Sequence, residues 1–339
     1  MNRFGRVDAK FLIGIGISLF FLILLFRKID VQQLAAAFRA MDYRYLVLAV
    51  AVTLFSYSFR AVRWHYLMLP IKKARPRYLL SATIICYMGN NLLPARLGEF
   101  LRAMVLAEKE ELEVSAVFAT LVIDRLFDGF SVLLILVVTF FTIKLPSGME
   151  KVQQGLVTGG YVTLALYLVV IAFLVFLKRA TARTLHIVGL FLKPFPKAVS
   201  DRVIPLLGSF ISGIRLTSRP GELVALLVSS AIIWLTAAWP IDLILKAFGI
   251  TLPFTASLFI LVFLVFAVMV PASPGYVGTY HAACMYGLMA FNFPKEQALS
   301  FALVVHAVSF FPVIFYGFFF LWRDRISFSA IKSAGSSKG

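Results

Sequence analysis

The chain has 339 residues, of which 61% are hydrophobic and 14% are charged, and its mean hydropathy is +0.91. Apolar runs of about 17–30 residues recur along the whole length, which excludes a soluble enzyme and indicates an all-α polytopic membrane protein. The formal net charge is +17. Its basic residues are spread over the loops between apolar segments, where they set topology and contact anionic lipid, so nucleic acid is not an expected partner.

Six apolar segments are long enough to cross a bilayer as helices. They lie at 10–26, 44–69, 114–143, 155–177, 221–246 and 297–322. The first follows a basic start and resembles a signal peptide. Its apolar stretch is long, however, and no small-x-small cleavage site follows closely, so we predict an uncleaved first span.

The loops between these spans differ in their basic residues. On one side, the N-terminus, the loops at 70–78 and 178–220, the first broken segment and the C-terminal tail together hold 22 Lys and Arg, and the opposite loops hold eight. Because basic loops stay in the cytoplasm, we predict that both termini are cytoplasmic.

Two shorter apolar segments, at 78–93 and 254–291, are interrupted by Pro and Gly. The order of spans and broken segments from 10–143 recurs from 155–322 in the opposite sense, within one membrane domain covering 1–339. Paired broken segments in inverted halves indicate the central site of a transporter. We therefore expect two re-entrant hairpins, or eight spans if 254–270 and 275–291 each cross completely.

The first break is the polar sequence GNNLLPARLGEFLR. Its candidate site residues are Asn90, Asn91, Pro94, Arg96, Gly98, Glu99 and Arg102. Proline stops the first helix, so a second helix is predicted to start near Ala95, with N–H groups free to hold an anion. The Arg96 guanidinium can bind a phosphate or carboxylate with two parallel hydrogen bonds. In the alternative, both asparagines cap helix ends, and Arg96 and Glu99 neutralise each other.

The second break is the sequence VPASPGYVGTYH at 270–281. Its helix-breaking residues are Pro271, Pro274, Gly275 and Gly278. They free backbone groups that need partners at membrane depth. His281 is a candidate proton relay, or a structural histidine with satisfied hydrogen bonds.

An Asp-Arg-x-x-Asp sequence lies within the long span at 114–143. Asp124 and Asp128 share one helix face, with Arg125 able to bridge toward Asp128. We expect these charges to pair with Arg96, Glu99 or Arg102, in a substrate site or a purely structural ion network. Two other arginines, Arg60 and Arg63, are expected to extend toward the cytoplasmic surface, and Arg63 with Trp64 resembles an interface anchor.

The sequence has few residues that suggest disulfide, metal or nucleotide chemistry. Cys86 and Cys284 lie in apolar segments and are expected to be small core residues rather than a disulfide or metal site. The four histidines show no ligand spacing, and no G-x-x-x-x-G-K-[ST] motif occurs. We therefore expect neither a metal nor a cofactor, and any energy for transport would come from a gradient.

The strings GNNLLPARLGEFLRA, DRLFDG and PASPGYVGTY resemble the flippase-like membrane family named after the transmembrane region of lysylphosphatidylglycerol synthase. The resemblance covers essentially the whole chain. In bifunctional members this region moves aminoacylated phospholipid between leaflets, and a C-terminal cytoplasmic domain makes that lipid. This sequence continues for 17 residues beyond 322. The resemblance therefore implies a lipid translocator without the synthase domain.

We accordingly expect a non-enzymatic flippase or scramblase for a phospholipid or lipid-linked headgroup. The arginines of the first break and Arg125 would contact the phosphate, and the carboxylates would hold them or contact a cationic headgroup. A homo-oligomer and a separate cytoplasmic transferase are expected as partners. Two alternatives remain, a membrane enzyme acting on lipid-linked substrates and an accessory subunit of such an enzyme.

Overall fold

The computed structural model describes residues 31–93, 96–143, 150–215, 219–269 and 274–324. Within these ranges the regular structure is entirely helical. The longer helices are α3 (Tyr43–Met68), α6 (Val114–Thr142), α7 (Glu150–Arg179), α10 (Pro220–Ala247) and α13 (Lys295–Arg323). The protein is an all-α polytopic membrane protein, as predicted. The expected span at 10–26 lies outside the described residues.

Four of these helices, α3, α7, α10 and α13, are long and apolar enough to cross a membrane. Each matches an expected span to within five residues at either end. The helix α6 is not among these four, because the charged residues Asp124, Arg125 and Asp128 lie near its middle. Its 29 residues extend about 43 Å, which is also long enough to cross a membrane.

The starts of the long helices follow local rules. The Asp42 carboxylate caps α3 by accepting the Arg44 backbone N–H at 3.0 Å. Hydrogen bonds from the Arg44 side chain also hold the pKa of Asp42 below its usual value. A proline at the first position, which has no N–H to leave unpaired, starts both α4 and α10, at Pro76 and Pro220.

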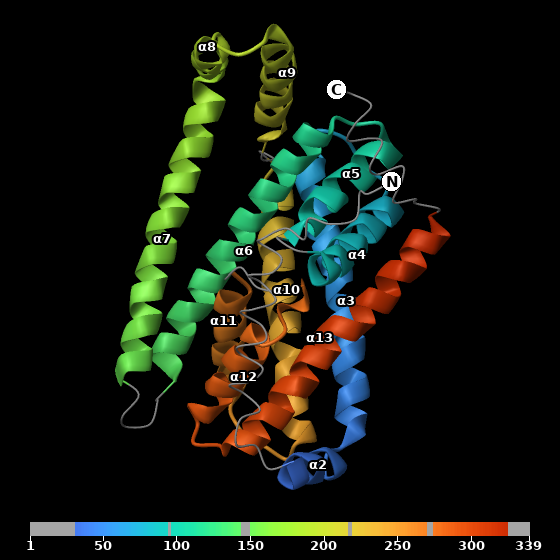
Figure 1. Ribbon diagram of the computed structural model, residues 1–339, viewed down its shortest axis with the longest axis vertical. Coiled ribbons are helices and arrows are strands. Elements are labelled where there is room, and N and C mark those ends of the chain that lie inside the picture. Colours follow the sequence, from blue (N-terminus) through green and yellow to red (C-terminus); the bar gives the residue numbers. More distant parts are fainter. Residues whose placement is uncertain (1–30, 94–95, 144–149, 216–218, 270–273, 325–339) are drawn as a thin grey trace, which may run out of the picture.

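Two pairs of short helices form hairpins within the bundle. The first is α4 (Pro76–Leu92) with α5 (Gly98–Glu110), and the second is α11 (Phe254–Met269) with α12 (Thr279–Met289). At 16 and 11 residues, α11 and α12 extend only about 24 and 16 Å, less than a hydrocarbon core of about 30 Å. The eight-span alternative is therefore wrong. Figure 1 shows the two hairpins entering the bundle from opposite ends, as the sequence predicts.

The buried apolar residues form two main cores. The first core surrounds α4 and α5 and includes Trp64, Ile85, Leu106, Leu121 and Val313. The second core surrounds α11 and α12 and includes Ile244, Phe259, Met285, Phe301 and Val308. Each hairpin is thus packed into its own core, and the helices α3, α10 and α13 pass through both.

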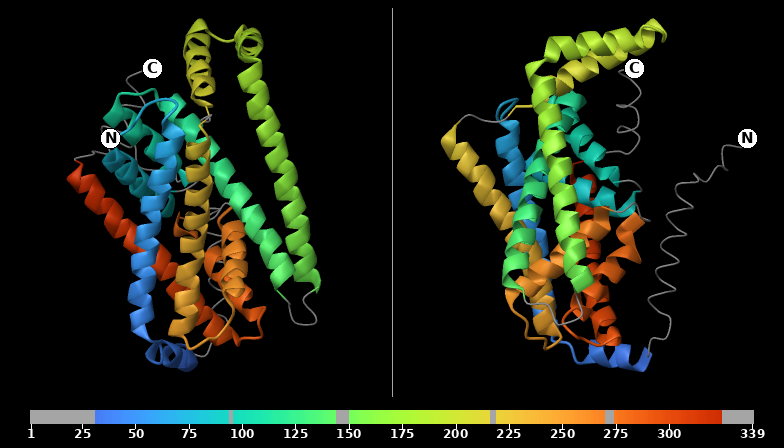
Figure 2. Two further views of the ribbon diagram at one scale, coloured as in Figure 1. Left: turned by 180° about the vertical axis from the view of Figure 1, so that it is seen from behind. Right: turned by 90° about the vertical axis from the view of Figure 1, so that its left-hand side faces the viewer.

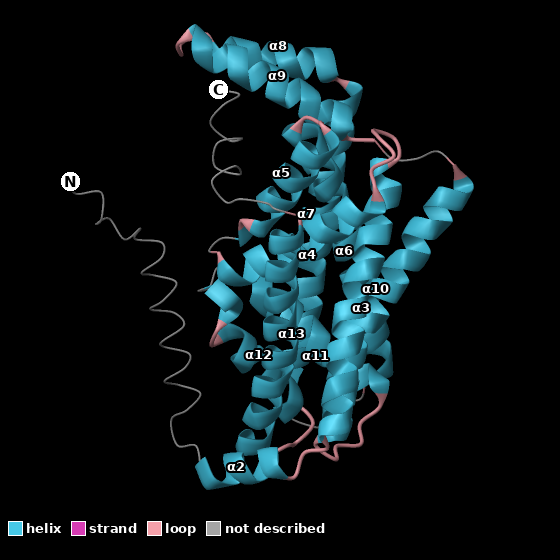
Figure 3. Ribbon diagram, turned by 90° about the vertical axis from the view of Figure 1, so that its right-hand side faces the viewer, coloured by secondary structure: helices cyan, strands magenta, loops and turns pink. Residues whose placement is uncertain are grey.

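The helices α8 (Thr181–Leu192) and α9 (Lys197–Gly213) lie across one end of the bundle (Figures 2 and 3). The sequence analysis treated 178–220 as a loop, and the charges that mark it as an extramembrane segment sit on these helices. A short helix, α2 (Val31–Arg39), lies across the opposite end (Figure 1). The connection between α3 and α4 lies toward the end of the bundle that carries α8 and α9, and so does the C-terminal end of α13. The loop charges predict the same, because they place 70–78, 178–220 and the C-terminal tail on one side of the membrane.

Orientation in the membrane can be measured by cysteine labelling. We expect Ser200→Cys, on α9, to react with an impermeant maleimide only from the cytoplasmic side, because its segment is rich in Lys and Arg. Thr251→Cys, exposed at the opposite end, should react only from outside. The natural Cys86 and Cys284 are buried and should stay silent. Labelling of Ser200→Cys from outside would overturn the predicted orientation.

Candidate functional site

The first break separates α4 from α5, and Pro94 within it lies outside the described residues. The Leu93 backbone N–H donates to the Gly89 carbonyl at 2.8 Å and ends α4. Arg96 adopts the left-handed region with a φ of +56°. Because a right-handed helix cannot continue through such a residue, α5 begins at Gly98 and not near Ala95, as the sequence analysis predicted.

Gly98 lies at the closest approach of the two arms. A Cβ atom at this position would overlap the Cys86 carbonyl oxygen and would lie 2.6 Å from Asn90 Oδ1. The buried Asn90 side chain donates to Glu99 Oε1 at 3.4 Å and so connects α4 to α5. The absence of a side chain at Gly98 thus allows the arms to pack directly against each other.

The second break contains one helical turn, η2 (Pro274–Tyr276), and Pro271 lies outside the described residues. Gly275 and Gly278 have φ values of +73° and +93°, which suit glycine and prevent a continuous helix. A Cβ on Gly275 would lie 3.6 Å from the Asn91 carbonyl oxygen of the first hairpin.

The tips of the two hairpins are joined by a hydrogen bond. Arg96 Nε donates to the Tyr276 hydroxyl at 3.2 Å. Among the described carboxylates, none forms an ion pair with Arg96, so the predicted neutralisation by Glu99 does not occur. The two broken segments therefore meet within the bundle.

Two histidines contact the second tip, His281 from α12 and His306 from α13. His281 Nδ1 accepts the Gly278 N–H at 3.3 Å, and His306 Nε2 donates to the Gly275 carbonyl at 2.8 Å. The two rings lie 4.6 Å apart at a steep angle. His281 therefore has a structural hydrogen bond, and its role as a proton relay stays a prediction. The sequence analysis did not single out His306.

A buried ion network lies beside the first hairpin, and Arg63 is at its centre. The Arg63 guanidinium bridges Asp124 at 2.8 Å and Asp128 at 2.7 Å, and its side chain is fully buried. The expectation that Arg63 anchors the chain at the membrane surface is wrong. Asp124 and Asp128 present their carboxylates on one helix face, as predicted. Both can therefore pair with the same arginine of α3.

The remaining members of the network connect α6 to the first hairpin. Arg102 pairs with Asp124 at 2.9 Å and lies 4.0 Å from the Trp64 ring, completely buried. Arg125 pairs with Asp128 at 2.7 Å and with Glu99 at 3.3 Å. The predicted pairing with Arg102 and Glu99 is confirmed. Arg102 is thus held inside the network, whereas Arg96 and Arg125 are more exposed.

A polar cavity of about 570 Å³ opens beside this network. Its charged lining residues are Arg60, Arg96, Arg125 and Asp128, and four tyrosines (Tyr57, Tyr87, Tyr167 and Tyr280) also line it. Most of its apolar lining residues come from α10, α11 and α13. A volume within roughly 300–1,000 Å³ with a few convergent polar groups is typical of a ligand site.

Arg60 was expected to extend toward the cytoplasm but turns into this cavity. Its Nη1 donates to the Tyr87 hydroxyl at 2.8 Å, and its guanidinium lies 4.0 Å from Asp128. The sequence could have indicated that Arg60 and Arg63 are buried, because two arginines three residues apart within an apolar span require buried partners.

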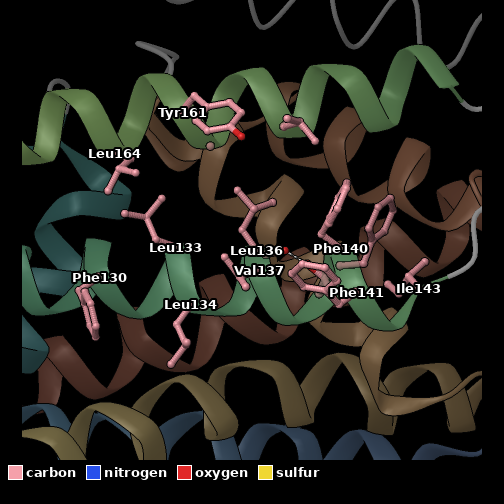
Figure 4. Close-up of a pocket in the computed structure, with 14 residues that line it drawn as sticks. Phe130, Leu133, Leu134, Leu136, Val137, Phe140, Phe141, Ile143, Tyr161 and Leu164 are labelled. Carbon is pink, nitrogen blue, oxygen red and sulfur yellow. Dashed lines mark hydrogen bonds between the residues drawn. The ribbon is translucent and has the colours of Figure 1, made fainter.

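A second cavity, of about 470 Å³, lies between α6 and α7 (Figure 4). Its lining is almost entirely apolar and includes Phe130, Leu133, Leu136, Phe140 and Leu164. It adjoins the polar cavity, since neighbouring residues on α6 and α7, such as Gly129 and Phe130, or Thr163 and Leu164, line the two cavities in turn.

Metal and thiol chemistry have little support in the part of the chain that the structure describes. No cluster of three His, Cys, Asp or Glu side chains suited to a metal occurs there. Cys86 and Cys284 are buried and unpaired, which confirms them as small core residues.

The geometry of two opposed hairpins can now be compared with known proteins. Residues 11–317 match the family described as the lysylphosphatidylglycerol synthase TM region. The chain belongs to this family. The match spans both hairpins and the ion network, so the resemblance inferred from three sequence motifs extends over nearly all of the protein.

Three relatives are similar to this chain at 21–26% identity. A UPF0104 membrane protein of Methanothermobacter thermautotrophicus is 26% identical and covers 73% of this chain and 75% of the relative. A UPF0104 membrane protein of Pyrococcus horikoshii is 24% identical, over 93% of this chain and 96% of the relative. The glycosyltransferase AglD of Haloferax volcanii is 21% identical over 87% of this chain, which spans only 51% of that relative.

Proposed function

We propose that this protein moves a lipid headgroup between the leaflets of the membrane. The observation that carries the proposal is the polar cavity at the point where the two hairpin tips meet. Its lining presents three guanidinium groups, of Arg60, Arg96 and Arg125, together with apolar residues of α10, α11 and α13. A headgroup phosphate fits the arginines, while hydrocarbon fits the other surfaces.

The apolar cavity between α6 and α7 supports this assignment (Figure 4). Because it adjoins the polar cavity, a lipid can keep its phosphate at the arginines and a hydrocarbon chain between these two helices. The large exposed apolar residues of α7, among them Leu168 and Phe173, face the surrounding lipid. The headgroup thus crosses in a polar environment, and its chains stay in an apolar one.

The site residues take two kinds of role in this proposal. Arg96 and Arg125 contact the headgroup, and so does Arg60. Arg63, Arg102, Asp124 and Asp128 fix the position of Arg125 through the ion network, together with Glu99 and with Asn90, which donates to Glu99. Transport would run downhill or be coupled to a gradient, in a cytoplasmic membrane with both termini inside.

A second candidate function is that of a membrane component of a lipid-modifying transferase. It is favoured by the relative named as a glycosyltransferase, of which this chain spans about half. In that arrangement the chain would act with a separate cytoplasmic transferase, and a homo-oligomer is compatible with both functions. Activity of the purified chain alone separates the two candidates.

The test is reconstitution of the purified full chain in vesicles that carry fluorescent headgroup lipids. We expect movement between leaflets to be accelerated at least tenfold over protein-free vesicles, measured by reductant quenching of the outer leaflet. Vesicles that contain heat-unfolded protein provide the control for leakage. Rates equal to those of protein-free vesicles for every headgroup would contradict the translocator and favour the accessory subunit.

A further inference from the structure

We infer that the polar cavity binds a lipid phosphate with at least two negative charges, namely a lipid phosphomonoester or diphosphate. The inference rests on the proposed function and names its substrate class. It departs from the aminoacylated phospholipid that the family description suggests, because such a headgroup carries added positive charge. The argument follows from the charge balance of the cavity and its network.

The described charged groups at this site do not balance. Five guanidinium groups, of Arg60, Arg63, Arg96, Arg102 and Arg125, face three carboxylates, of Glu99, Asp124 and Asp128. Arginine stays protonated in proteins, so an excess of two positive charges remains when all three carboxylates are ionised.

The distribution of this excess points to the cavity. Arg63 and Arg102 are fully buried and each contacts a carboxylate at 2.9 Å or less. By contrast, Arg96 donates only to a tyrosine hydroxyl, and Arg60 donates to another while lying 4.0 Å from Asp128. Both line the cavity, so the uncompensated positive charge faces the space where a ligand would bind.

Uncompensated charge away from water is unfavourable, and an anion of matching charge relieves it. A phosphodiester headgroup has one negative charge and would leave one guanidinium uncompensated. A zwitterionic or cationic headgroup would leave two or more. A phosphomonoester dianion restores neutrality, a diphosphate supplies two to three negative charges, and both offer enough acceptor oxygens for three arginines.

A second observation points to a polar ligand at the same place. The indole Nε1 of Trp234 is buried, forms no hydrogen bond to any described residue, and belongs to a side chain that lines the cavity. Arg125 Nε is likewise buried without an acceptor among the described residues. A buried donor without an acceptor is unfavourable, so a ligand oxygen here would be stabilising.

Binding can be measured without transport, with the full chain in phosphatidylcholine nanodiscs. The probes are farnesyl phosphate, farnesyl diphosphate, the methyl diester of farnesyl phosphate, and farnesol, titrated by calorimetry. We expect the monoester and the diphosphate to bind at least tenfold more tightly than the diester at pH 7.5. Equal or tighter binding of the diester would overturn the inference.

The pH dependence of binding provides an internal control. A phosphate monoester has a second pKa of about 6, so its dianion rises from about one-tenth to about nine-tenths between pH 5 and pH 7. Affinity for farnesyl phosphate should rise several-fold to about tenfold over this range. The diester should show no such rise, and its titration also reports any effect of the nearby His281 and His306. A parallel rise for the diester would contradict a dianion site.

A variant pair tests the charge count. Arg60→Gln lowers the excess to one positive charge, so the preference for monoester over diester should fall at least fivefold. Arg202→Gln removes a charge from the exposed surface of α9 and should keep the wild-type preference. An unchanged preference in Arg60→Gln would overturn the charge-matching argument.

Failure of this inference and failure of the proposed function give different results. Tight dianion binding without any leaflet movement would reject the translocator and keep the dianion site. Leaflet movement of monoanionic or cationic lipids, without preferential dianion binding, would reject the dianion site and keep the translocator.

Discussion

Arg63→Ala is expected to lower the free energy of unfolding by about 3–5 kcal/mol, the usual consequence of removing one partner from a buried ion pair. Arg63 contacts both Asp124 and Asp128 within 2.8 Å, and its own side chain is fully buried. Without Arg63, two carboxylates lie together with fewer cations near them. Thermal unfolding of the detergent-purified protein, followed by fluorescence-detected size exclusion, measures the effect.

Two further variants define the origin of the loss. Arg63→Ala combined with Asp128→Asn should recover part of the lost stability, because one of the stranded charges is removed. Arg44→Ala breaks the ion pair with Asp42, in which the Arg44 side chain is almost fully exposed, and should change the unfolding temperature little. If Arg63→Ala proved as stable as Arg44→Ala, the network would not stabilise the fold.

The second large effect concerns transport by Arg96→Ala. We expect leaflet movement to fall at least tenfold while the protein remains folded, since Arg96 is exposed toward the cavity and has no carboxylate partner among the described residues. Arg96→Lys keeps the charge but loses the two-pronged donor geometry, so its rate should fall between those of Arg96→Ala and the wild type. The vesicle assay described above provides the measurement.

The matched control is Tyr276→Phe, which removes the hydroxyl that accepts from Arg96 and leaves the guanidinium in place. If Arg96 acts on the headgroup, Tyr276→Phe should retain most of the activity. An equal loss in both variants would instead assign Arg96 to joining the hairpin tips. Because Glu99 pairs with Arg125 and not with Arg96, Arg96→Ala with Glu99→Ala should not restore transport. Full rescue by this double change would contradict headgroup binding.

The spans and the hairpins could be predicted from sequence because the signals are local. A bilayer requires long apolar helices, and Pro and Gly in two short apolar segments stop helices inside it. The Asp124 and Asp128 pair followed from helical periodicity alone. The Lys and Arg residues of the loops then predicted which connections lie at the same end of the bundle, and Figure 1 shows these connections at one end.

The partners across the bundle could not be predicted, because they depend on how helices distant in sequence pack. Arg63 meets Asp124 across 61 residues, and Arg96 meets Tyr276 across 180. The simplest assignment for Arg63 and Trp64 was therefore an interface anchor, whereas the structure buries both. The amphipathic helices α8 and α9 were missed because their charged residues resembled an extended loop.

The passage of α13 through both cores has a mechanical consequence. Its residues up to Val308 pack in the second core, those from Val313 pack in the first, and Pro312 lies between them. Proline removes a backbone hydrogen bond within a helix, so α13 bends most easily at the boundary between the cores. The contact between the hairpin tips is polar, so little apolar surface would be exposed if the tips moved apart. An alternating exposure of the polar cavity to the two leaflets would therefore place the bend of α13 at Pro312, close to the cavity-lining residues Val305, Val308 and Ser309.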